Sequence, residues 1–599
     1  MENLREIYEK RVADFSANAT ALQSKYVRFS LIRLVTFIVA IAVIILLFTI
    51  HVGLGVAGIV VFLLGFSRFI SWHNGVKREK ELNENLVIIN QKEISFLDED
   101  YSVFDGGKRY VNAEHPYTTD LDIFGEHSYF QSTNRTASAI GHERLADYLR
   151  YPTDFKEVMR RQVSLAELKD KMIWRQEFQA VGLATEDDIT HVEELKKWLH
   201  EEPYISNNSL WKTLIILAPF LALGSLVLWL TVLPWYVIIL FFLPAGYALK
   251  QTVERINLTH HQTNKAEKIL AGYASMIEHI EKQEFSAPKL KELREVFFLE
   301  NKSASEQISE LSYIISQLNL RNNFFAIFFN FSVLWDLKQV KKLEEWRAEQ
   351  NELLPKWFEA LAEFEALNSL ATAYYNNPDW TFPEINKAAI VRAEELGHPL
   401  IPKAKRINND ISIPTKGHLK LVTGSNMAGK STFMRTVGLN IVLAQIGAPV
   451  CAKKLSLPPL KVYTSMRTED ALHESTSSFY AELKRLKFII EAVESGENIF
   501  FLLDEILKGT NSRDRHTGSK ALIRQLIEAK GSGIIATHDL DLGVLEKEYG
   551  GAVENLRIEV QIHDGKLFFD YKVKPGVSES FNATILMSQM GIRIPEDEI

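Results

Sequence analysis

The sequence predicts a multi-domain protein with α-helical transmembrane hairpins, an all-α middle region and a C-terminal α/β domain. Two pairs of apolar runs lie at residues 31–70 and 211–249. Residues 251–370 form a long, charged stretch with helical periodicity and few Gly or Pro. After Pro399, short β-like runs alternate with helical stretches, which is typical of an α/β domain. A chain of 599 residues is also too long for a single core.

The composition excludes some classes of protein. The net charge is −8, so no global basic signature indicates nucleic-acid binding, and any such contact requires a local patch. The single cysteine, Cys451, excludes an internal disulfide and a cysteine-rich zinc site. It also fits a reducing compartment.

The apolar runs predict two membrane hairpins. Residues 31–50 and 52–70 each approach the roughly 20 apolar residues that span a bilayer. A second pair follows at 211–231 and 234–249. The alternative is two buried helical hairpins of a soluble core. The membrane interpretation is favoured by flanking basic residues, namely Arg28, Arg33, Arg68, Lys77, Arg78, Lys80, Lys212 and Lys250.

Neither short connecting turn contains Lys or Arg, so the positive-inside rule places both turns outside and the rest in the cytoplasm. The long polar lead and the lack of a cleavage site argue against a signal peptide. A fifth apolar run, Phe324 to Trp335, is too short to span, and Asn330 interrupts it. We expect it to be a core helix.

These patterns divide the chain into six units. We expect a cytoplasmic N-terminal segment, a first hairpin, a connector with the first part of the helical core, a second hairpin, a helical core or lever, and the α/β domain. Their expected bounds are 1–28, 29–72, 73–208, 209–250, 251–395 and 396–599.

A phosphate-binding loop (P-loop) is predicted at Gly424 to Ser431, which fits the pattern G-x-x-x-x-G-K-[ST]. The loop follows a β-like run and opens a helical run, so its amides can converge on a phosphate at a helix N-terminus. Gly429 allows close backbone approach, Lys430 neutralises the terminal phosphates, and Ser431 ligates Mg²⁺. The alternative is a chance match, against which both flanks argue. ATP and Mg²⁺ are the expected cofactors.

Two further strand ends carry polar residues. The apolar run Ile499 to Leu503 precedes Asp504, an expected Mg²⁺ ligand, and Glu505, which is placed to polarise the attacking water. His538 ends another buried strand and is expected to sense the γ-phosphate. The alternatives are an acidic cap after a strand and a structural histidine. We expect Glu505, His538 and Lys430 to be catalytic, and the three strand ends to meet on one face of the sheet.

The segments "HPLIPKAKRINNDISI", "LVTGSNMAGKSTFMR", "DEILKGTNSRDR" and "ATHD" strongly resemble the ABC-type ATPase domain of the MutS family of DNA mismatch-repair proteins. The resemblance implies that ATP is held by the loop residues Gly424, Ser425, Asn426, Met427, Ala428, Gly429, Lys430, Ser431 and Thr432. Ser425 and Ala428 replace the usual Pro and Gly of the family.

A signature turn also resembles the family. In "DALHESTSSFYAELKRL", Ser477 and Ser478 stand where the family places a turn that completes the ATP site of the partner subunit. The resemblance therefore implies a homodimer with composite sites. It extends to residues 122–168, which look like the start of the MutS core domain.

The resemblance also implies binding of mismatched or branched DNA. However, the mismatch-reading domain of the family has no counterpart in the first 120 residues, and residues 211–249 occupy the place of its DNA-gripping clamp. The chain also ends without the family's C-terminal dimerisation segment. The basic groups that could contact DNA are small, and a solvated face is the alternative for each: Lys403, Lys405 and Arg406; Lys453 and Lys454; Lys338, Lys341 and Lys342.

The sequence motifs leave three candidate functions. The favoured one is a multi-pass membrane protein whose cytoplasmic MutS-like domain hydrolyses ATP. An ABC-type transporter would carry a signature close to L-S-G-G-Q and about six spans per half, whereas this chain has "STSSFYAEL" and two hairpins. Ionisable residues of the spans, such as Arg33 and Arg68, also lie near span ends and not at mid-membrane. The third function is a membrane-tethered mechanical or scaffolding ATPase that does not bind DNA.

Overall fold

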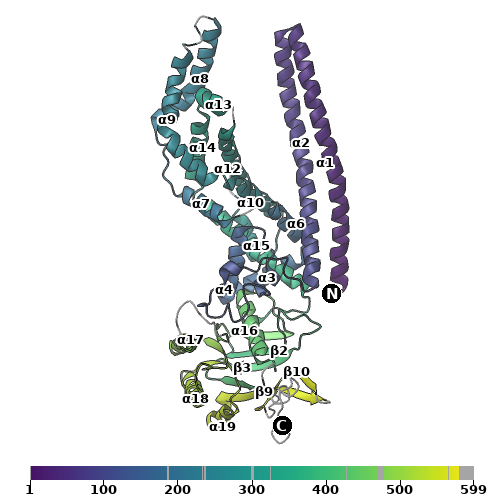
Figure 1. Cartoon of the computed structure of the whole chain (residues 1–599), viewed down its shortest axis with the longest axis vertical. Coiled ribbons are helices and arrows are strands. Elements are labelled where there is room, and N and C mark those ends of the chain that lie inside the picture. The colour runs from purple at the N-terminus through teal and green to yellow at the C-terminus, as the bar shows by residue number, and fades with distance from the viewer. Residues whose placement is uncertain are drawn as a thin grey trace.

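The computed structural model describes residues 2–184, 188–231, 234, 236, 238–298, 302–323, 326–425, 428–467, 478–563 and 566–578. The molecule is elongated, with long helices extending from one end and β-sheets at the other (Figure 1). The expected combination of a mainly helical region and a mixed α/β region at the C-terminal end is confirmed.

Helices α1 (Glu2–Ile50) and α2 (Val52–Leu97) form an antiparallel hairpin with a turn at His51. At 1.5 Å per residue each helix is about 70 Å long, roughly twice the thickness of a bilayer core. The polar lead that we expected to be a separate segment is the first half of α1. In the half of the hairpin near the turn, large apolar side chains are exposed, as at Leu46 and Val61.

Helices α8 (Ser209–Thr231) and α9 (Ile238–Thr263) form the second hairpin. Both hairpins extend toward the same end of the molecule, away from the sheets (Figure 1). By length and composition, three described helices could cross a membrane: α1, α2 and α8. The fourth expected span, 234–249, is not among them in the described part of the chain. The described apolar stretch of α9 ends near Leu249, and the helix continues with polar residues into the helical body.

Helix α13 (Ala326–Val333) corrects the expectation of a core helix. Only Ala326 and Ser332 are buried in it, whereas Ile327 is 68% and Phe328 67% exposed. The helix packs one face against α8 and α9, and its other face has no cover in the described structure.

The helical body lies between the hairpins and the sheets. Its long helix α15 (Leu353–Asn376) is buried along most of its length and packs against α4 and α5. The other helices are α3 (Tyr129–Thr133), α4 (Ala139–Arg150), α5 (Phe155–Asp170), α6 (Met172–Leu183), α7 (Ile189–Leu199), α10 (Ala266–Glu281), α11 (Pro288–Glu295), α12 (Ala304–Asn319) and α14 (Trp335–Gln350).

The C-terminal region contains two sheets. A four-stranded sheet has the order β1-β5-β2-β3 and a six-stranded sheet the order β10-β9-β4-β8-β7-β6. We expected the α/β domain to start at residue 396. The first strand of the sheets, β1, lies earlier, at Glu384–Ile385. Their strands are β1 (Glu384–Ile385), β2 (Ile390–Leu396), β3 (Asn409–Pro414), β4 (Leu419–Thr423), β5 (Lys454–Leu457), β6 (Lys461–Ser465), β7 (Ile499–Asp504), β8 (Ser532–Thr537), β9 (Val553–His563) and β10 (Lys566–Pro575).

Helices cover both faces of the larger sheet. Helix α16 (Lys430–Ile446) shares a core with Phe500 and Leu502 of β7. Helices α17 (Ser478–Glu494) and α18 (Ser512–Glu528) share another core with Phe501 and Leu503 of the same strand. Successive side chains of a strand point to opposite faces, so β7 reads as a continuous apolar run. The short helix α19 (Leu545–Tyr549) follows β8.

Candidate nucleotide site

The glycine-rich turn lies between β4 and α16, as the sequence predicts. Gly429 has φ of +98°, in the left-handed region that favours glycine, and a Cβ there would lie 3.0 Å from the Tyr571 ring. A Cβ on Gly424 would lie 2.5 Å from the carbonyl oxygen of Ile558. The close approach of the β9 backbone therefore requires glycine at 424, and the positive φ favours glycine at 429. Asn426 and Met427 lie outside the described residues.

Lys430 closes this turn at the first residue of α16. Its Nζ donates hydrogen bonds to the carbonyl oxygens of Gly424 at 2.9 Å and Ser425 at 3.1 Å. Burial lowers the pKa of the Lys430 ammonium. A cation beside the N-terminus of a helix is a favourable place for an anion such as phosphate. Ala428 is buried, and Thr432 lies in the first turn of α16.

Ser431 and Asp504 meet at the ends of α16 and β7. The Ser431 hydroxyl donates a hydrogen bond to Oδ2 of Asp504. The other carboxylate oxygen, Oδ1, is buried and lacks a hydrogen-bond partner among the described residues. Burial raises the pKa of Asp504. A hydroxyl and an unpartnered carboxylate oxygen fit Mg²⁺, a hard cation that prefers oxygen ligands and would neutralise phosphate charge here.

Glu505, His538 and Lys430 lie together, although the chain separates them. Nε2 of His538 is 2.6 Å from Oε1 of Glu505 and 3.3 Å from Nζ of Lys430. Lys508 also lies 3.3 Å from the Glu505 carboxylate. The hydrogen bond with His538, aided by Lys508, lowers the pKa of Glu505 to about 2. The carboxylate is therefore ionised at neutral pH, as polarising a water molecule requires.

The sheet topology explains this meeting. Strands β4, β8 and β7 are adjacent and parallel, so the residues that follow them lie along one edge. Gly424 follows β4, His538 follows β8, and Asp504 ends β7. Residues beyond the carboxyl ends of parallel strands commonly form ligand sites.

A cavity of about 470 Å³ adjoins the turn and has a volume typical of small-molecule sites. Besides Lys430 and Glu505, its lining includes residues that sequence analysis did not select: His398, Ile401, Ile407, Asn409, Phe433 and Tyr571. Burial lowers the pKa of His398 to about 4, so the ring is neutral at neutral pH. His398, Ile407 and Asn409 belong to a motif segment quoted above. No sequence signal pointed to Tyr571, which β10 brings to the site.

The signature turn is described only from its last residue. Ser477 lies outside the described residues, and Ser478 begins α17, although its side chain also lies outside them. Further along α17, the Glu482 carboxylate accepts a hydrogen bond from the backbone amide of Leu507. Helix α17 is therefore tied to the turn that carries Glu505 in the same chain.

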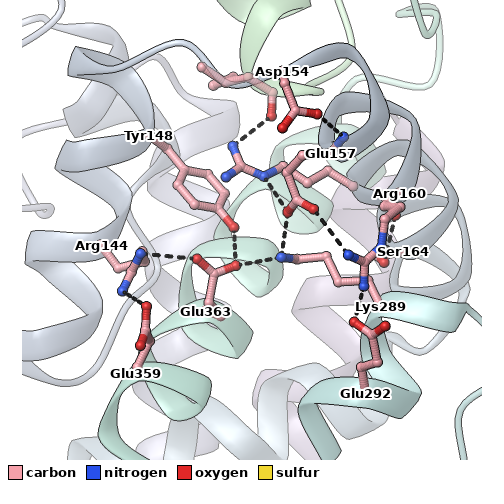
Figure 2. Close-up of polar contacts among 12 residues, drawn as sticks. Arg144, Tyr148, Asp154, Glu157, Arg160, Ser164, Lys289, Glu292, Glu359 and Glu363 are labelled. Carbon is pink, nitrogen blue, oxygen red and sulfur yellow. Dashed lines mark hydrogen bonds and ion pairs between the residues drawn. The ribbon is translucent and has the colours of Figure 1, made fainter. Parts of the chain in front are cut away.

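The far end of α16 is held by a buried charged network (Figure 2). Nη1 of Arg161 donates a hydrogen bond to the carbonyl oxygen of Ile446 at 3.2 Å, and Nε of Arg161 donates one to Glu157 at the same distance. Lys289 bridges Glu157 at 2.5 Å and Glu363 at 2.9 Å. The helix that begins at the nucleotide site therefore ends in contact with α5, which this network links to α11 and α15.

Most of the basic residues considered for DNA contact are paired with acids. Lys403 and Arg406 lie 3.6 and 2.9 Å from Asp379. The other pairs are Lys405 with Glu99, Lys453 with Glu395, and Lys341 with Glu345. This pairing favours the solvated-face interpretation for the four lysines, whereas the Arg406 side chain is only 7% exposed.

Parallel strands, a glycine-rich turn at a helix N-terminus and acidic groups at a neighbouring strand end define an α/β domain with a candidate nucleotide site. The family model for MutS domain V matches residues 420–597. The chain is similar to proteins named DNA mismatch repair protein MutS. The one from Thermotoga sp. is 34% identical over 235 residues, 38% of this chain and 28% of the relative. The one from Clostridium botulinum is 31% identical over 260 residues, which are 42% of this chain and 28% of the relative.

A third relative of the same name, from Fusobacterium nucleatum, is 35% identical over 211 residues, 34% of this chain and 23% of the relative. These matches support a MutS relationship for the C-terminal region. The matched segment spans less than a third of the length of each of these curated relatives.

Proposed function

We propose that this protein is a membrane-anchored, MutS-like ATPase that binds and hydrolyses ATP with Mg²⁺. The observation that carries the proposal is the cluster of Lys430, Ser431, Asp504, Glu505 and His538 at the ends of three adjacent parallel strands. A cation, a hydroxyl–carboxylate pair and an ionised carboxylate are the groups that phosphoryl transfer to water needs.

Each group has a role that follows from its position. Lys430 and the amides at the start of α16 bind the β- and γ-phosphates. Ser431 and Asp504 hold Mg²⁺, which neutralises charge on the phosphates when it is bound. Glu505 orients and polarises the attacking water, and His538 contacts both Glu505 and Lys430, where it can sense the γ-phosphate.

We propose that the working unit is a homodimer. The described site residues lie at one edge of the sheet, at the ends of β4, β7 and β8. In the MutS-like arrangement the second chain supplies its signature turn, with Ser477 and Ser478, to the open side. Two composite sites in a pair of identical chains imply C2 symmetry.

The proposed anchor is built from α1, α2 and the α8–α9 hairpin. Both hairpins extend the same way from the helical body, so one bilayer can receive both (Figure 1). The basic residues near the span ends support a cytoplasmic position for the helical body and the sheets. Confinement to a membrane raises the effective concentration of the chains and favours the dimer.

DNA enters the proposal through the relatives, whose names describe DNA mismatch repair. A second candidate is a mechanical or scaffolding ATPase without DNA, which is favoured by the pairing of the basic residues with acids. Both candidates share the chemistry at Lys430 and Glu505.

The test is ATP hydrolysis by the detergent-purified protein, alone and with duplex, mismatched or branched DNA. Hydrolysis that the Glu505→Gln variant lacks supports the ATPase assignment. Stimulation by one DNA form supports the DNA-dependent function, and an unchanged rate with all three supports the second candidate. A wild-type protein that neither binds nor hydrolyses ATP overturns both.

A further inference from the structure

The described residues on either side of the α13 segment (residues 326–335) lie at one polar neck of the helical body. Nε of Arg321 is 3.4 Å from Oδ2 of Asp336, which joins the residues just before and after the segment. The indole Nε1 of Trp335 donates a hydrogen bond to the carbonyl oxygen of Gln317 at 2.9 Å. Arg321 also donates one to Oδ1 of Asn257 on α9 at 2.8 Å. The entry and exit of the segment are therefore fixed on the same side.

The inner face of α13 packs against the second hairpin. The ring of Phe331 meets Phe242 of α9 edge to face, with centroids 6.5 Å apart. Phe331 and Leu334 also line a small enclosed space together with residues of both hairpin helices: Leu214, Ala218, Leu221, Phe241, Pro244 and Ala245. The segment therefore lies beside the apolar half of α9 and the first half of α8, a candidate membrane span.

The outer face of α13 is exposed and strongly apolar. Ile327 and Phe328 are 68% and 67% exposed, and Phe329 is 47% exposed. Three large apolar side chains on a helix of eight residues form a patch that water does not favour. The two hairpin helices that pack against α13 also expose large apolar groups, such as Phe220 of α8 and Leu243 of α9. Exposed apolar side chains therefore lie on all three of these packed helices.

We propose that α13 (Ala326–Val333) is a re-entrant membrane element: it lies in the hydrocarbon beside the second hairpin, and the described chain before and after it is held on the same side. This inference rests on the proposed membrane anchor. Helix α13 is about 12 Å long, which is too short to cross a bilayer core of roughly 30 Å. Re-entrant backbone is tolerated in a membrane where it packs against protein, as the inner face of α13 does. Trp335 at the neck suits the membrane interface.

The acyl chains of the bilayer are the proposed occupant of the outer face. The polar neck formed by Arg321, Asp336 and Trp335 marks the level at which the surface passes from headgroups to hydrocarbon. The span α8 extends through this level and beyond it, so lipid that surrounds α8 also reaches α13. Helix α13 is thus a membrane element in addition to the four helices of the two hairpins.

Spin-label accessibility in reconstituted vesicles tests the inference. Single cysteines replace Phe328, Leu223 or Tyr313 in the full-length Cys451→Ala protein, which is placed in phosphatidylethanolamine–phosphatidylglycerol vesicles. Leu223 is an exposed position on α8, and Tyr313 is an exposed aromatic residue on α12, on the polar side of the neck. Collision rates are measured with oxygen, which concentrates in lipid, and with a water-soluble nickel chelate.

The label at Phe328 should behave like the label at Leu223, with high oxygen and low nickel accessibility, whereas Tyr313 should show the reverse. Nickel accessibility at Phe328 equal to that at Tyr313, with Leu223 in lipid, overturns the inference alone. Shielding of Phe328 from both reagents also overturns it, because a protein surface, such as a second copy of the chain, then covers the patch. Water exposure at both Phe328 and Leu223 instead refutes the proposed anchoring of this hairpin.

Discussion

Replacing Lys289 with Met should destabilise the helical body, because this lysine bridges two largely buried carboxylates. The Lys289 and Glu363 side chains are each 9% exposed, and Glu157 is 18% exposed. Removing one partner of a buried ion pair costs about 3–5 kcal/mol, since the remaining charge stays desolvated. Arg144 remains 3.3 Å from Glu363, and Arg161 remains beside Glu157. We therefore expect a loss near the lower end of this range, about 3 kcal/mol.

The loss should depend on pH. Burial raises the pKa of Glu363, but nearby charges and hydrogen bonds, of which Lys289 has the largest effect, lower it by more. The pKa of Glu363 is therefore lowered. In the wild type, the lowered pKa of Glu363 stabilises the folded protein at pH values above the pKa that Glu363 has in the unfolded chain. This stabilisation is lost as the pH falls through the pKa of Glu363 in the folded protein. Without Lys289 the pKa of Glu363 rises, and protonation then relieves the buried charge. The stability difference between wild type and Lys289→Met should therefore be largest at neutral pH and shrink in mild acid.

Thermal unfolding of the purified protein, followed by tryptophan fluorescence, measures the effect. Lys302→Met is the matched control, because Lys302 pairs with Glu310 at 2.7 Å and both side chains are nearly half exposed. It should change the unfolding temperature little or not at all. Adding Glu363→Gln to Lys289→Met should recover part of the loss. If Lys289→Met unfolds at the same temperature as Lys302→Met, the network does not stabilise the body as argued.

Four other predictions concern the nucleotide site and the membrane anchor. Lys430→Ala should abolish tight ATP binding in a fluorescent-nucleotide titration, while Glu505→Gln should keep binding but lose about 10²–10⁴-fold in hydrolysis; wild-type turnover in the latter refutes its catalytic role. Gly429→Ala should weaken ATP binding, because the positive φ and the neighbouring ring both oppose a Cβ; unchanged affinity would show that the turn adapts. Mixing Lys430→Ala chains with chains that carry Ser477→Ala and Ser478→Ala should restore about one working site per mixed dimer; subunit exchange without recovered hydrolysis counts against composite sites. Alkaline phosphatase fused to the C-terminus should be inactive in bacterial cells, and an active fusion would reverse the proposed orientation.

Local sequence patterns were sufficient to predict the phosphate-binding turn, the polar strand ends and the apolar runs of membrane length. Gly429, Lys430 and Ser431 could be placed at a strand-to-helix turn because the glycine-rich spacing and both flanks lie within a few residues of one another. Asp504 and His538 could be assigned to strand ends because fully buried strands read as continuous apolar runs. The membrane-length runs were equally visible, since hydrophobicity summed over about 20 residues is a property of composition.

Tertiary structure decided which distant groups meet. Tyr571 reaches the nucleotide cavity because β10 pairs with β9 beside β4, and Lys289 meets Glu363 because α11 packs against α15. Helix α13 could not be placed from the sequence for the same reason. Its apolar run was compatible with a buried core helix, and only the packing in the folded protein showed that one face is uncovered. Sequence periodicity reports which face of an element is apolar. What covers that face depends on contacts between segments that are far apart in the chain, and these form only when the whole chain folds.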